Sequence, residues 1–548
     1  MNSAWKRLTK SRKKSKQSPQ YMNTEINLTQ KDISQQLDIN LKNIKEALGN
    51  SGDLSVREFK MGKPTLHKVA LLYINGLSDK QIIGNFIIER LMGNVNNTES
   101  VDPKSPGQLF TYIKENILTV ATVKEETDLN KLLLSLLSGQ TILLIDGWNQ
   151  ALSCSAEGGE LRSISEPMTE PAVRGPKDSF TESLITNTAM VRRRIKSPNL
   201  WIETMKLGKI TQTDVAVMYV KGIVNDKLLK EVKERLDKME ADEIAGSNTI
   251  EEWINDDTWT PWPTIFTTER PDVVAGNLME GRVAIFVDGT PIPLILPAVW
   301  SQFFQTAEDY YLRWNIASFL RILRVGAFLI TLLGPSLFIA FLSYHPELIP
   351  TPLLINLMSQ RQGVPFPVFI EALLMEITFE VLREAGVRMP RPIGQAVSIV
   401  GALVLGEAAV AAGIVSSAMV IVVAGTAIAS FTIPHHTMLD AVRLLRFVMM
   451  IFAASFGLYG VGLCVIMLVA HTCSVRSFGI PYLVPFAPLI LTDWKDTIIR
   501  YPKPFLSTRP RLINQKKIKR TGDPHNLGPS SRENQQMYNK SKRDSNET

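Results

Sequence analysis

Long apolar stretches are concentrated in the second half of the chain. Four of them read Val325–Tyr344, Ile393–Ala412, Ile414–Ile433 and Phe447–Ala470. Each is close to the ~20 residues that a helix needs to cross ~30 Å of hydrocarbon. In lipid a helix satisfies its own backbone hydrogen bonds, whereas an open chain does not. We therefore predict an all-α transmembrane domain over residues 325–472, with four spans.

A further helical segment, Phe366–Leu382, is less apolar. It carries Glu371, Glu376 and Glu380, and Glu384 follows directly. Because so many carboxylates are costly in lipid, we predict an amphipathic helix that lies at the interface or packs within the assembly. A fifth span remains the alternative.

Arginines come just before the first span, at Arg313, Arg321 and Arg324. Positive charge next to a span favours the cytoplasmic side, so these residues predict that the soluble front is cytoplasmic. The basic tail, with Lys516 and Arg520 among its cations, also favours that side. Four spans return the chain to the side where it started.

The front half contains an internal repeat. Residues 69–76 and 215–222 share Val, Ala, Tyr and Gly at four of eight positions, and TILLIDG at 141–147 corresponds to VAIFVDG at 283–289. Short apolar runs with β-branched residues, glycine turns and helical patterns indicate α/β units. We predict an α/β soluble region of two similar subdomains, residues 55–165 and 198–298, joined by a connector at 166–197.

The remaining segments differ in composition. Residues 1–54 are expected to be a basic, largely disordered arm and lead-in, and residues 1–30 lack the apolar core of a secretory signal. Residues 299–324 are juxtamembrane and 473–513 membrane-proximal. Residues 514–548 form a polar basic tail that is expected to be disordered. The basic arm is interpreted as a solvated segment, so no nucleic-acid partner is predicted.

Reactive side chains are scarce in the front half. It has no glycine-rich phosphate loop, no Ser-His-Asp set and no metal-ligand cluster, and its one histidine is His67. Asp146 and Asp288 each precede a glycine, which favours a role in turn geometry over catalysis. The three cysteines of the chain form no CxxC motif. We predict a protein that is not an enzyme and that needs no cofactor or metal.

Gly401–Ala429 is the candidate pore segment, because it is rich in small residues that let helices approach closely. Glu407 is the single ionisable residue of the last three spans, and a ring of such carboxylates would favour cations. Valine side chains nearby could close a water path by dewetting. Ordinary helix packing is the alternative for all of these positions. The other pore or gating candidates are Val410, Val415, Ser416, Val422 and Thr426.

Two adjacent histidines, His435 and His436, follow Pro434 at the edge of the last span. Histidine titrates near neutral pH, so a pH sensor is one interpretation. A solvated helix start is the simpler one.

Several longer stretches resemble the A subunit of the GerA family of spore germinant receptors. They include GNSGDLSVREFKMG (49–62), RRRIKSPNLWIE (192–203), TERPDVVAGNLMEGRVAIFVDGTP (268–291) and RSFGIPYLVPFAPL (476–489). The resemblance covers about residues 45–510. Ser417 departs from it, because many members have proline at this position.

The resemblance implies a membrane subunit of a nutrient-sensing receptor in the inner membrane of the bacterial spore, with the soluble front on the core side. The implied partners are a B subunit, through which the nutrient binds, and a lipoprotein C subunit. It further implies a homo-oligomer in membrane lipid that acts as a cation channel and opens on germinant binding. A non-conducting scaffold and a secondary transporter are the alternatives.

Overall fold

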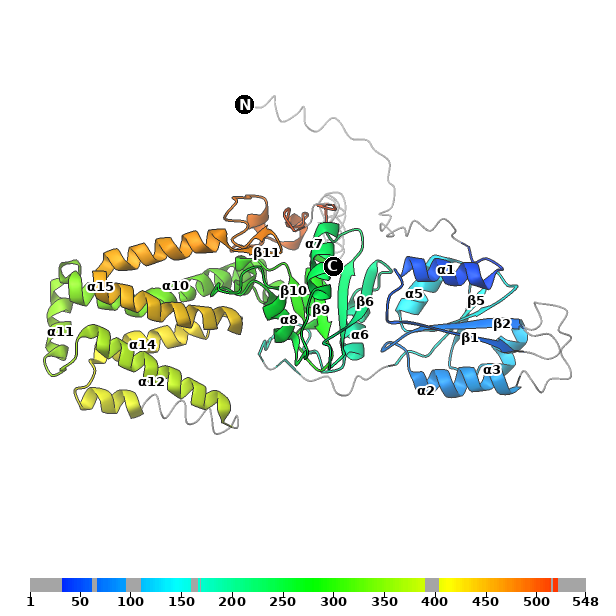
Figure 1. The fold of residues 1–548 in the computed structure, drawn as a ribbon, viewed down its shortest axis with the longest axis horizontal. Helices are drawn as coiled ribbons and strands as arrows, with labels where there is room; N and C mark the ends of the chain where they lie inside the picture. Colours follow the sequence, from blue (N-terminus) through cyan, green and yellow to red (C-terminus); the bar gives the residue numbers. More distant parts are fainter. Residues whose placement is uncertain are drawn as a thin grey trace, which may run out of the picture. The chain divides into compact units, whose positions relative to one another are not determined.

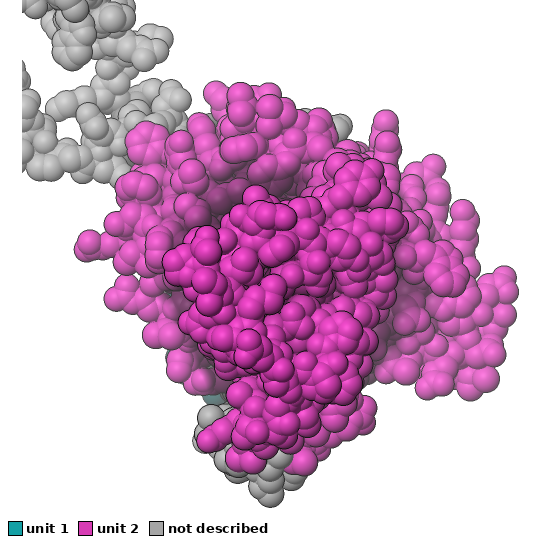
Figure 2. Space-filling model, turned by 90° about the vertical axis from the view of Figure 1, so that its left-hand side faces the viewer, with its two compact units in different colours: residues 1–159, 196–201 teal, residues 160–195, 202–548 magenta. Residues whose placement is uncertain are grey.

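The computed structural model describes residues 32–61, 67–94, 110–158, 166–167, 169–389, 404–513 and 516–520. The chain forms two compact units, one of Met1–Gly159 with Lys196–Trp201 and one of Glu160–Ile195 with Ile202–Thr548. Figure 2 shows unit 2 from the side on which its helical part lies in Figure 1. Residues 1–31 of the predicted arm, and the tail beyond residue 520, lie outside the described residues.

The first α/β lobe, lobe 1, is built on a five-stranded sheet of order β1-β2-β4-β5-β3. Its recorded strand pairs are antiparallel, with Val69 opposite Ile145 and Leu143 opposite Leu152. Buried aliphatic side chains of β2, β4 and the flanking helices form its core. Its elements are α1 (Leu37–Ala47), β1 (Leu54–Met61), β2 (His67–Ile74), α2 (Lys80–Ile82), π-helical turns at Ile83–Ile88 and Ile113–Ile117, α3 (Glu89–Asn94), β3 (Val123–Glu126), α5 (Leu129–Leu137), β4 (Thr141–Ile145) and β5 (Ala151–Cys154).

The second lobe, lobe 2, has a five-stranded sheet of order β6-β7-β9-β10-β8. The central strand β9 is fully buried, as expected for the run VAIFV. Proline at the first position of α9 and a left-handed Gly281 just after it mark the start and end of that helix. The elements are α6 (Leu184–Arg194), β6 (Leu200–Leu207), β7 (Thr213–Val220), α7 (Asp226–Asp237), α8 (Ser247–Ile254), β8 (Phe266–Thr267), α9 (Pro271–Glu280), β9 (Val283–Val287) and β10 (Leu294–Leu296).

The two lobes have the same architecture, which confirms the prediction of two similar α/β subdomains. Each strand of lobe 1 has a counterpart at the same place in the order of lobe 2. Asp146 Oδ1 accepts a hydrogen bond from the backbone N–H of Leu37 at 3.0 Å, and Asp288 Oδ1 accepts one from Leu184 at 3.0 Å. Both aspartates therefore satisfy a free N–H at the start of a helix, which is a structural role.

The repeat begins earlier than predicted in each lobe. α1 lies within the segment predicted as arm and lead-in, and α6 lies within the predicted connector. α1 packs through Leu37, Leu41 and Ile44, which recur at helical spacing and are buried. These helices belong to the lobes because Asp146 and Asp288 cap them and because they bury apolar side chains there.

The second half of the chain is helical, and Figure 1 shows its longer helices lying side by side. After two 3-10 turns, Trp300–Phe304 and Ala307–Tyr310, the helices begin with α10. A further helical segment covers residues 404–411. The named helices are α10 (Trp314–Tyr344), α11 (Thr351–Arg361), α12 (Val368–Arg388), α14 (Ser417–Ser430) and α15 (His436–Ser474).

α15 is not one straight helix. Gly457 has φ 60° and ψ −140°, which is not helical, and it separates arms at residues 436–456 and 458–474. The two ends of α15 both reach lobe 2, since the ring of His435 lies 4.5 Å from that of Phe266 in β8 and His471 Nε2 lies 3.0 Å from Thr260 Oγ1. The helix therefore doubles back at Gly457, as the two arms in Figure 1 show.

The predicted spans are confirmed in part. Within the described residues, α10 and α15 are the two helices that are long and apolar enough to cross a membrane. Residues 414–433 form the shorter apolar helix α14, with 14 residues, and the first part of Ile393–Ala412 lies outside the described residues. The fourth predicted span, Phe447–Ala470, lies within the candidate span α15, but Gly457 interrupts the helix, so one continuous helix is not confirmed.

The C-terminal segment returns to lobe 2. Two short strands, β11 (Arg476–Ser477) and β12 (Ile480–Pro481), are followed by 3-10 turns at Asp493–Lys495 and Lys503–Phe505. Residues 516–520, which were predicted to be disordered, pair instead with the chain around Arg509, whose N–H donates to Ile518 O at 2.8 Å. Arg509 Nε also donates to Met279 O of α9 at 2.7 Å. The backbone hydrogen bonds between residues 516–520 and the chain around Arg509 explain why this segment differs from the prediction of disorder.

Candidate functional site

The predicted pore positions lie in different surroundings. Glu407 is exposed on the helix at 404–411, and Val410 and Val422 are half-buried. Val415, Ser416 and Thr426 are buried inside the chain's own helical part. Thr426 packs close to α10, since a Cβ added to Gly334 would lie 2.7 Å from Thr426 Cγ2. Of the six, Glu407 is the one residue that is exposed on the helical part.

Ser416 connects α14 to α12. Its hydroxyl donates to Glu371 Oε2 at 3.0 Å, and its backbone N–H donates to the same oxygen at 3.1 Å. The other oxygen of Glu371 accepts from Arg361 Nε at 3.1 Å. Glu371 is fully buried, so these three donors offset the cost of burying its charge. This chain of contacts fixes the start of α14 against α11 and α12.

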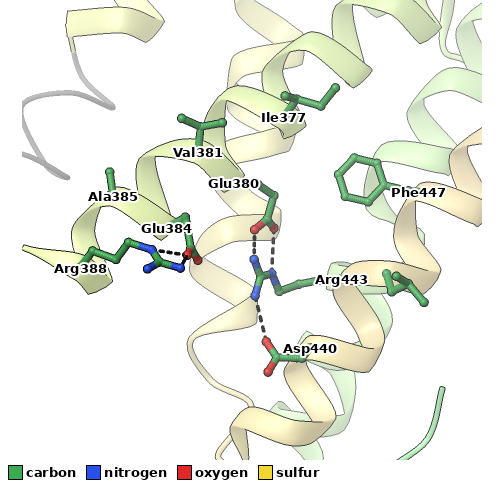
Figure 3. A pocket seen from close by; sticks show the side chains of 10 residues that line it. Ile377, Glu380, Val381, Glu384, Ala385, Arg388, Asp440, Arg443 and Phe447 are labelled. Atoms are coloured by element: carbon green, nitrogen blue, oxygen red, sulfur yellow. Dashed lines mark hydrogen bonds and ion pairs between the residues drawn. The ribbon is translucent and has the colours of Figure 1, made fainter.

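Two other carboxylates of α12, those of Glu376 and Glu380, are paired with arginines of α15. Glu376 Oε2 lies 2.9 Å from Arg446 Nη2, and both residues are buried. Glu380 binds Arg446 at 3.1 Å and is held by Arg443 through both of its oxygens, and Arg443 also donates to Asp440 at 2.9 Å. Figure 3 shows Glu380 and Arg443 pointing toward each other from the two helices.

Sequence reasoning missed these pairs. It treated the glutamates of α12 as costly charges and did not match them with cations elsewhere in the chain. A usable signal was present, since Glu376 and Glu380 share one face of a helix and Arg443 and Arg446 share one face of another. The pairs explain how α12 can pack against apolar helices. Ile377, Val381 and Leu444 line an open groove of about 670 Å³ beside them (Figure 3).

The arginines predicted to set topology have a second role at the start of α10. Arg321 Nε and Arg324 Nη1 donate to the same oxygen of Asp309, at 3.0 and 2.8 Å, and Arg321 Nη1 donates to Asp496 Oδ1 at 2.9 Å. Burial alone would raise the pKa of Asp309, but the hydrogen bond and charge of Arg324 and the charge of Arg321 bring it below its usual value. Arg313, by contrast, is exposed.

The linker between α14 and α15 contacts lobe 2 through His435. The imidazole is buried, packs against Phe266 with ring centroids 4.5 Å apart, and lies 3.5 Å from Glu170 Oε1. Thr268 donates to the other oxygen of Glu170 at 2.6 Å. His435 is therefore not a solvated helix start, because it joins the helical part to lobe 2.

A cavity of about 710 Å³ opens at this junction. α9 and the juxtamembrane residues 302–311 form one side, and the α14–α15 linker forms another. Its lining includes aromatic side chains and charges of both signs. The charged residues are Glu170, Arg270, Asp272, Glu280, Arg282, Glu308, Arg324, Lys503 and Arg520.

Glu170 and His435 affect the pH dependence of folding stability in opposite directions. Burial raises the pKa of Glu170 from its ordinary 4.5 to about 7 and lowers the pKa of His435 from 6.5 to about 4. Stability from Glu170 is present below pH 4.5 and is lost as pH rises through 7. Stability from His435 is present above pH 6.5 and is lost as pH falls through 4. Between about pH 4.5 and 6.5 the two contributions oppose each other.

In the variant Glu170→Gln, we expect the effect of His435 on the pH dependence of stability to be seen without the opposing effect of Glu170. The unfolding temperature of this variant should rise more steeply between pH 4 and 6.5 than that of the wild type. Thermal unfolding of the purified chain across this pH range measures the effect. Parallel profiles for the two proteins would contradict the assignment.

Comparison with known proteins shows to which family the chain is similar. The model of the family described as "Bacillus/Clostridium GerA spore germination protein" matches residues 42–512. Spore germination protein KA of Bacillus subtilis (strain 168) is 48% identical over 501 residues, which cover 91% of this chain and 90% of that protein. Spore germination protein GerLA of Bacillus cereus is 37% identical over 476 residues, covering 87% of this chain and 95% of that protein.

A solved structure is also similar. The N-terminal domain of the A subunit of the Bacillus megaterium spore germinant receptor GerK3 is 44% identical, with a TM-score of 0.40, and the match covers 49% of this chain and 97% of that one. The family match spans both lobes and the helical part. The chain therefore belongs to the Bacillus/Clostridium GerA family of spore germination proteins.

Proposed function

We propose that the chain is the membrane-embedded A subunit of a nutrient germinant receptor in the inner membrane of the bacterial spore. Several copies surround a water path that conducts cations, and the path opens when germinant binds. A B subunit, through which the nutrient binds, and a lipoprotein C subunit are the partners. Family membership supports the role in spore germination, and the apolar helices support membrane association.

The observation that carries the conducting role is the exposure of Glu407. Its side chain reaches the surface of the helical part, on a helix that also exposes Val404 and Leu405. A carboxylate facing lipid at this position is costly, whereas one facing water is not. A ring of copies with Glu407 turned toward a shared aqueous path satisfies the charge and favours cations.

The arrangement of α15 supports a common side for the soluble parts. Because α15 doubles back at Gly457, the segment after it returns to lobe 2, where Ala298 N–H donates to Ser477 Oγ at 3.0 Å. The lobe that precedes α10 and the C-terminal segment thus share one side of the helical part. The arginines at the start of α10 favour the cytoplasm for that side.

We expect Glu407→Gln to lower cation flux severalfold without loss of assembly, because it removes the charge that attracts cations and keeps the side-chain size. Rubidium efflux from liposomes that contain the purified chain measures it. Glu384→Gln is the matched control, since Glu384 is an exposed glutamate of the same helical part that pairs with Arg388. Equal efflux from the Glu407 variant and the wild type would count against this pore assignment.

A further inference from the structure

The cavity at the junction of lobe 2 and the helices is lined by an acidic and a basic residue, Glu280 and Arg282, whose side chains have few hydrogen-bond partners. Glu280 ends α9, and Arg282 follows two residues later, after the left-handed Gly281. Both line the cavity. The other charged pair on this wall is internally satisfied, because Arg270 Nη2 lies 2.9 Å from Asp272 Oδ2 and also donates to Pro176 O.

Arg282 is buried and only partly bonded. Its Nη1 donates to Pro297 O at 3.0 Å and to Gln302 Oε1. Its Nε–H has no hydrogen-bond partner among the residues that the structure describes, although the side chain is only 4% exposed. A buried guanidinium nitrogen without a partner is costly, and a ligand that accepts a hydrogen bond would remove that cost.

The carboxylate of Glu280 also has few partners. Within the described part of the chain, the recorded contact of its carboxylate is a long ion pair with Arg520, at 3.9 Å. Burial raises the pKa of this carboxyl group and lowers that of the Arg282 guanidinium. The charges of Glu280 and Arg282 act on each other, but within the described residues no hydrogen bond or ion pair joins the two side chains.

The repeat shows that the fold does not require these charges. At the corresponding place in lobe 1, between α5 and β4, the chain reads Ser138-Gly139-Gln140. Gln140 accepts a hydrogen bond from Ser153 Oγ across the sheet. The same turn is thus built with neutral residues in lobe 1 and with an acid and a base in lobe 2, where the cavity lies.

We propose that this cavity binds a zwitterionic group, with the anionic part held by Arg282 and the cationic part by Glu280. A single-charged ligand would leave one of the two residues unsatisfied, whereas a zwitterion pairs with both. Phe266, Phe431 and Ile433 line other parts of the cavity and provide an apolar surface for the rest of the molecule. A ligand here would contact lobe 2, the juxtamembrane turn and the α14–α15 linker together, and so would bias their relative arrangement.

Two sources can supply this chemistry: a small soluble zwitterion or the headgroup of a zwitterionic lipid. The test has one arm for each, and it reads binding rather than conduction. In the first arm, the full chain in nanodiscs of phosphatidylglycerol is heated with L-leucine or O-phosphoethanolamine. In the second, nanodiscs that also contain phosphatidylethanolamine are compared with those that do not. A bound ligand raises the unfolding temperature in proportion to its occupancy.

Single-charged relatives of leucine provide the chemical control. 4-Methylpentanoate lacks the ammonium group and 3-methylbutylamine lacks the carboxylate. We expect a saturable rise in unfolding temperature in at least one arm, and a smaller or absent rise with the two single-charged compounds. The arm that responds identifies the source.

Glu280→Ser and Arg282→Gln are the test variants, because they introduce the residues that lobe 1 has at the same place. Each should abolish the rise. Lys206→Gln, an exposed change on β6, is the matched control and should retain it. If neither arm produces a rise in the wild type, if both single-charged compounds act as well as leucine, or if the rise persists in both variants, the proposal is overturned.

Discussion

Arg446→Ala is expected to destabilise the chain by about 3–5 kcal/mol, because it leaves a buried carboxylate without its partner. Arg446 is 1% exposed and lies 2.9 Å from Glu376, which is fully buried. Glu380 keeps Arg443 as a partner, so the cost falls mainly on Glu376. Thermal or denaturant unfolding of the purified chain in detergent measures the loss.

Two further variants separate the charge effect from lost packing. Arg388→Ala removes a cation whose pair with Glu384 is exposed, and we expect a change below about 1 kcal/mol. The double variant Glu376→Leu/Arg446→Met replaces the buried pair with apolar side chains and should recover most of the stability. If the double variant is as unstable as Arg446→Ala, the loss does not come from an unpaired charge.

Gly457→Ala is expected to have the second large effect and to lower the free energy of unfolding by about 2–4 kcal/mol. The backbone at Gly457 lies where residues with a Cβ are strained, and strain of this kind costs about 1–3 kcal/mol. An added Cβ would also lie 2.8 Å from Tyr344 Cβ, so overpacking adds to the strain. Unfolding of the purified variant measures the total.

Gly462→Ala is the matched control for Gly457. Gly462 lies in the second arm of α15, and a Cβ added there meets nothing within 4 Å. Alanine favours helix over glycine by up to about 1 kcal/mol, so this variant should be neutral or slightly stabilised. A similar effect of the two substitutions would mean that the reversal at Gly457 does not depend on glycine.

The α/β architecture could be predicted because the two lobes repeat the same local signals. TILLIDG and VAIFVDG become the central strands β4 and β9, and the aspartate that follows each strand caps the first helix of its lobe. The same comparison, extended toward the start of the chain, would have found α1 and α6. α6 lies in a segment rich in proline, threonine and arginine, and α1 follows a basic arm, so local composition placed both helices outside the lobes.

The reversal within α15 was harder to predict. Hydropathy measures how apolar a stretch is, and Phe447–Ala470 is apolar throughout. Three glycines, Gly457, Gly460 and Gly462, lie in the middle of this stretch and were the available signal. Glycine is also common in continuous membrane helices, so the pattern by itself does not distinguish a turn from a helix interface.

The charged contacts depend on tertiary structure. Glu376 and Arg446 are 70 positions apart in the sequence, and no local period relates them. The sequence analysis therefore treated the carboxylates of α12 as a cost in lipid and did not pair them with the arginines of α15. The assignment of Glu407 to a pore rests on its charge and exposure, and it stays a prediction.

Conductance of the purified chain in a planar bilayer tests the central claim most directly. The account predicts discrete cation currents from the chain without other subunits, or with the partner subunits and nutrient added, and smaller currents for Glu407→Gln. A well-folded, membrane-inserted chain that passes no current under either condition would contradict it.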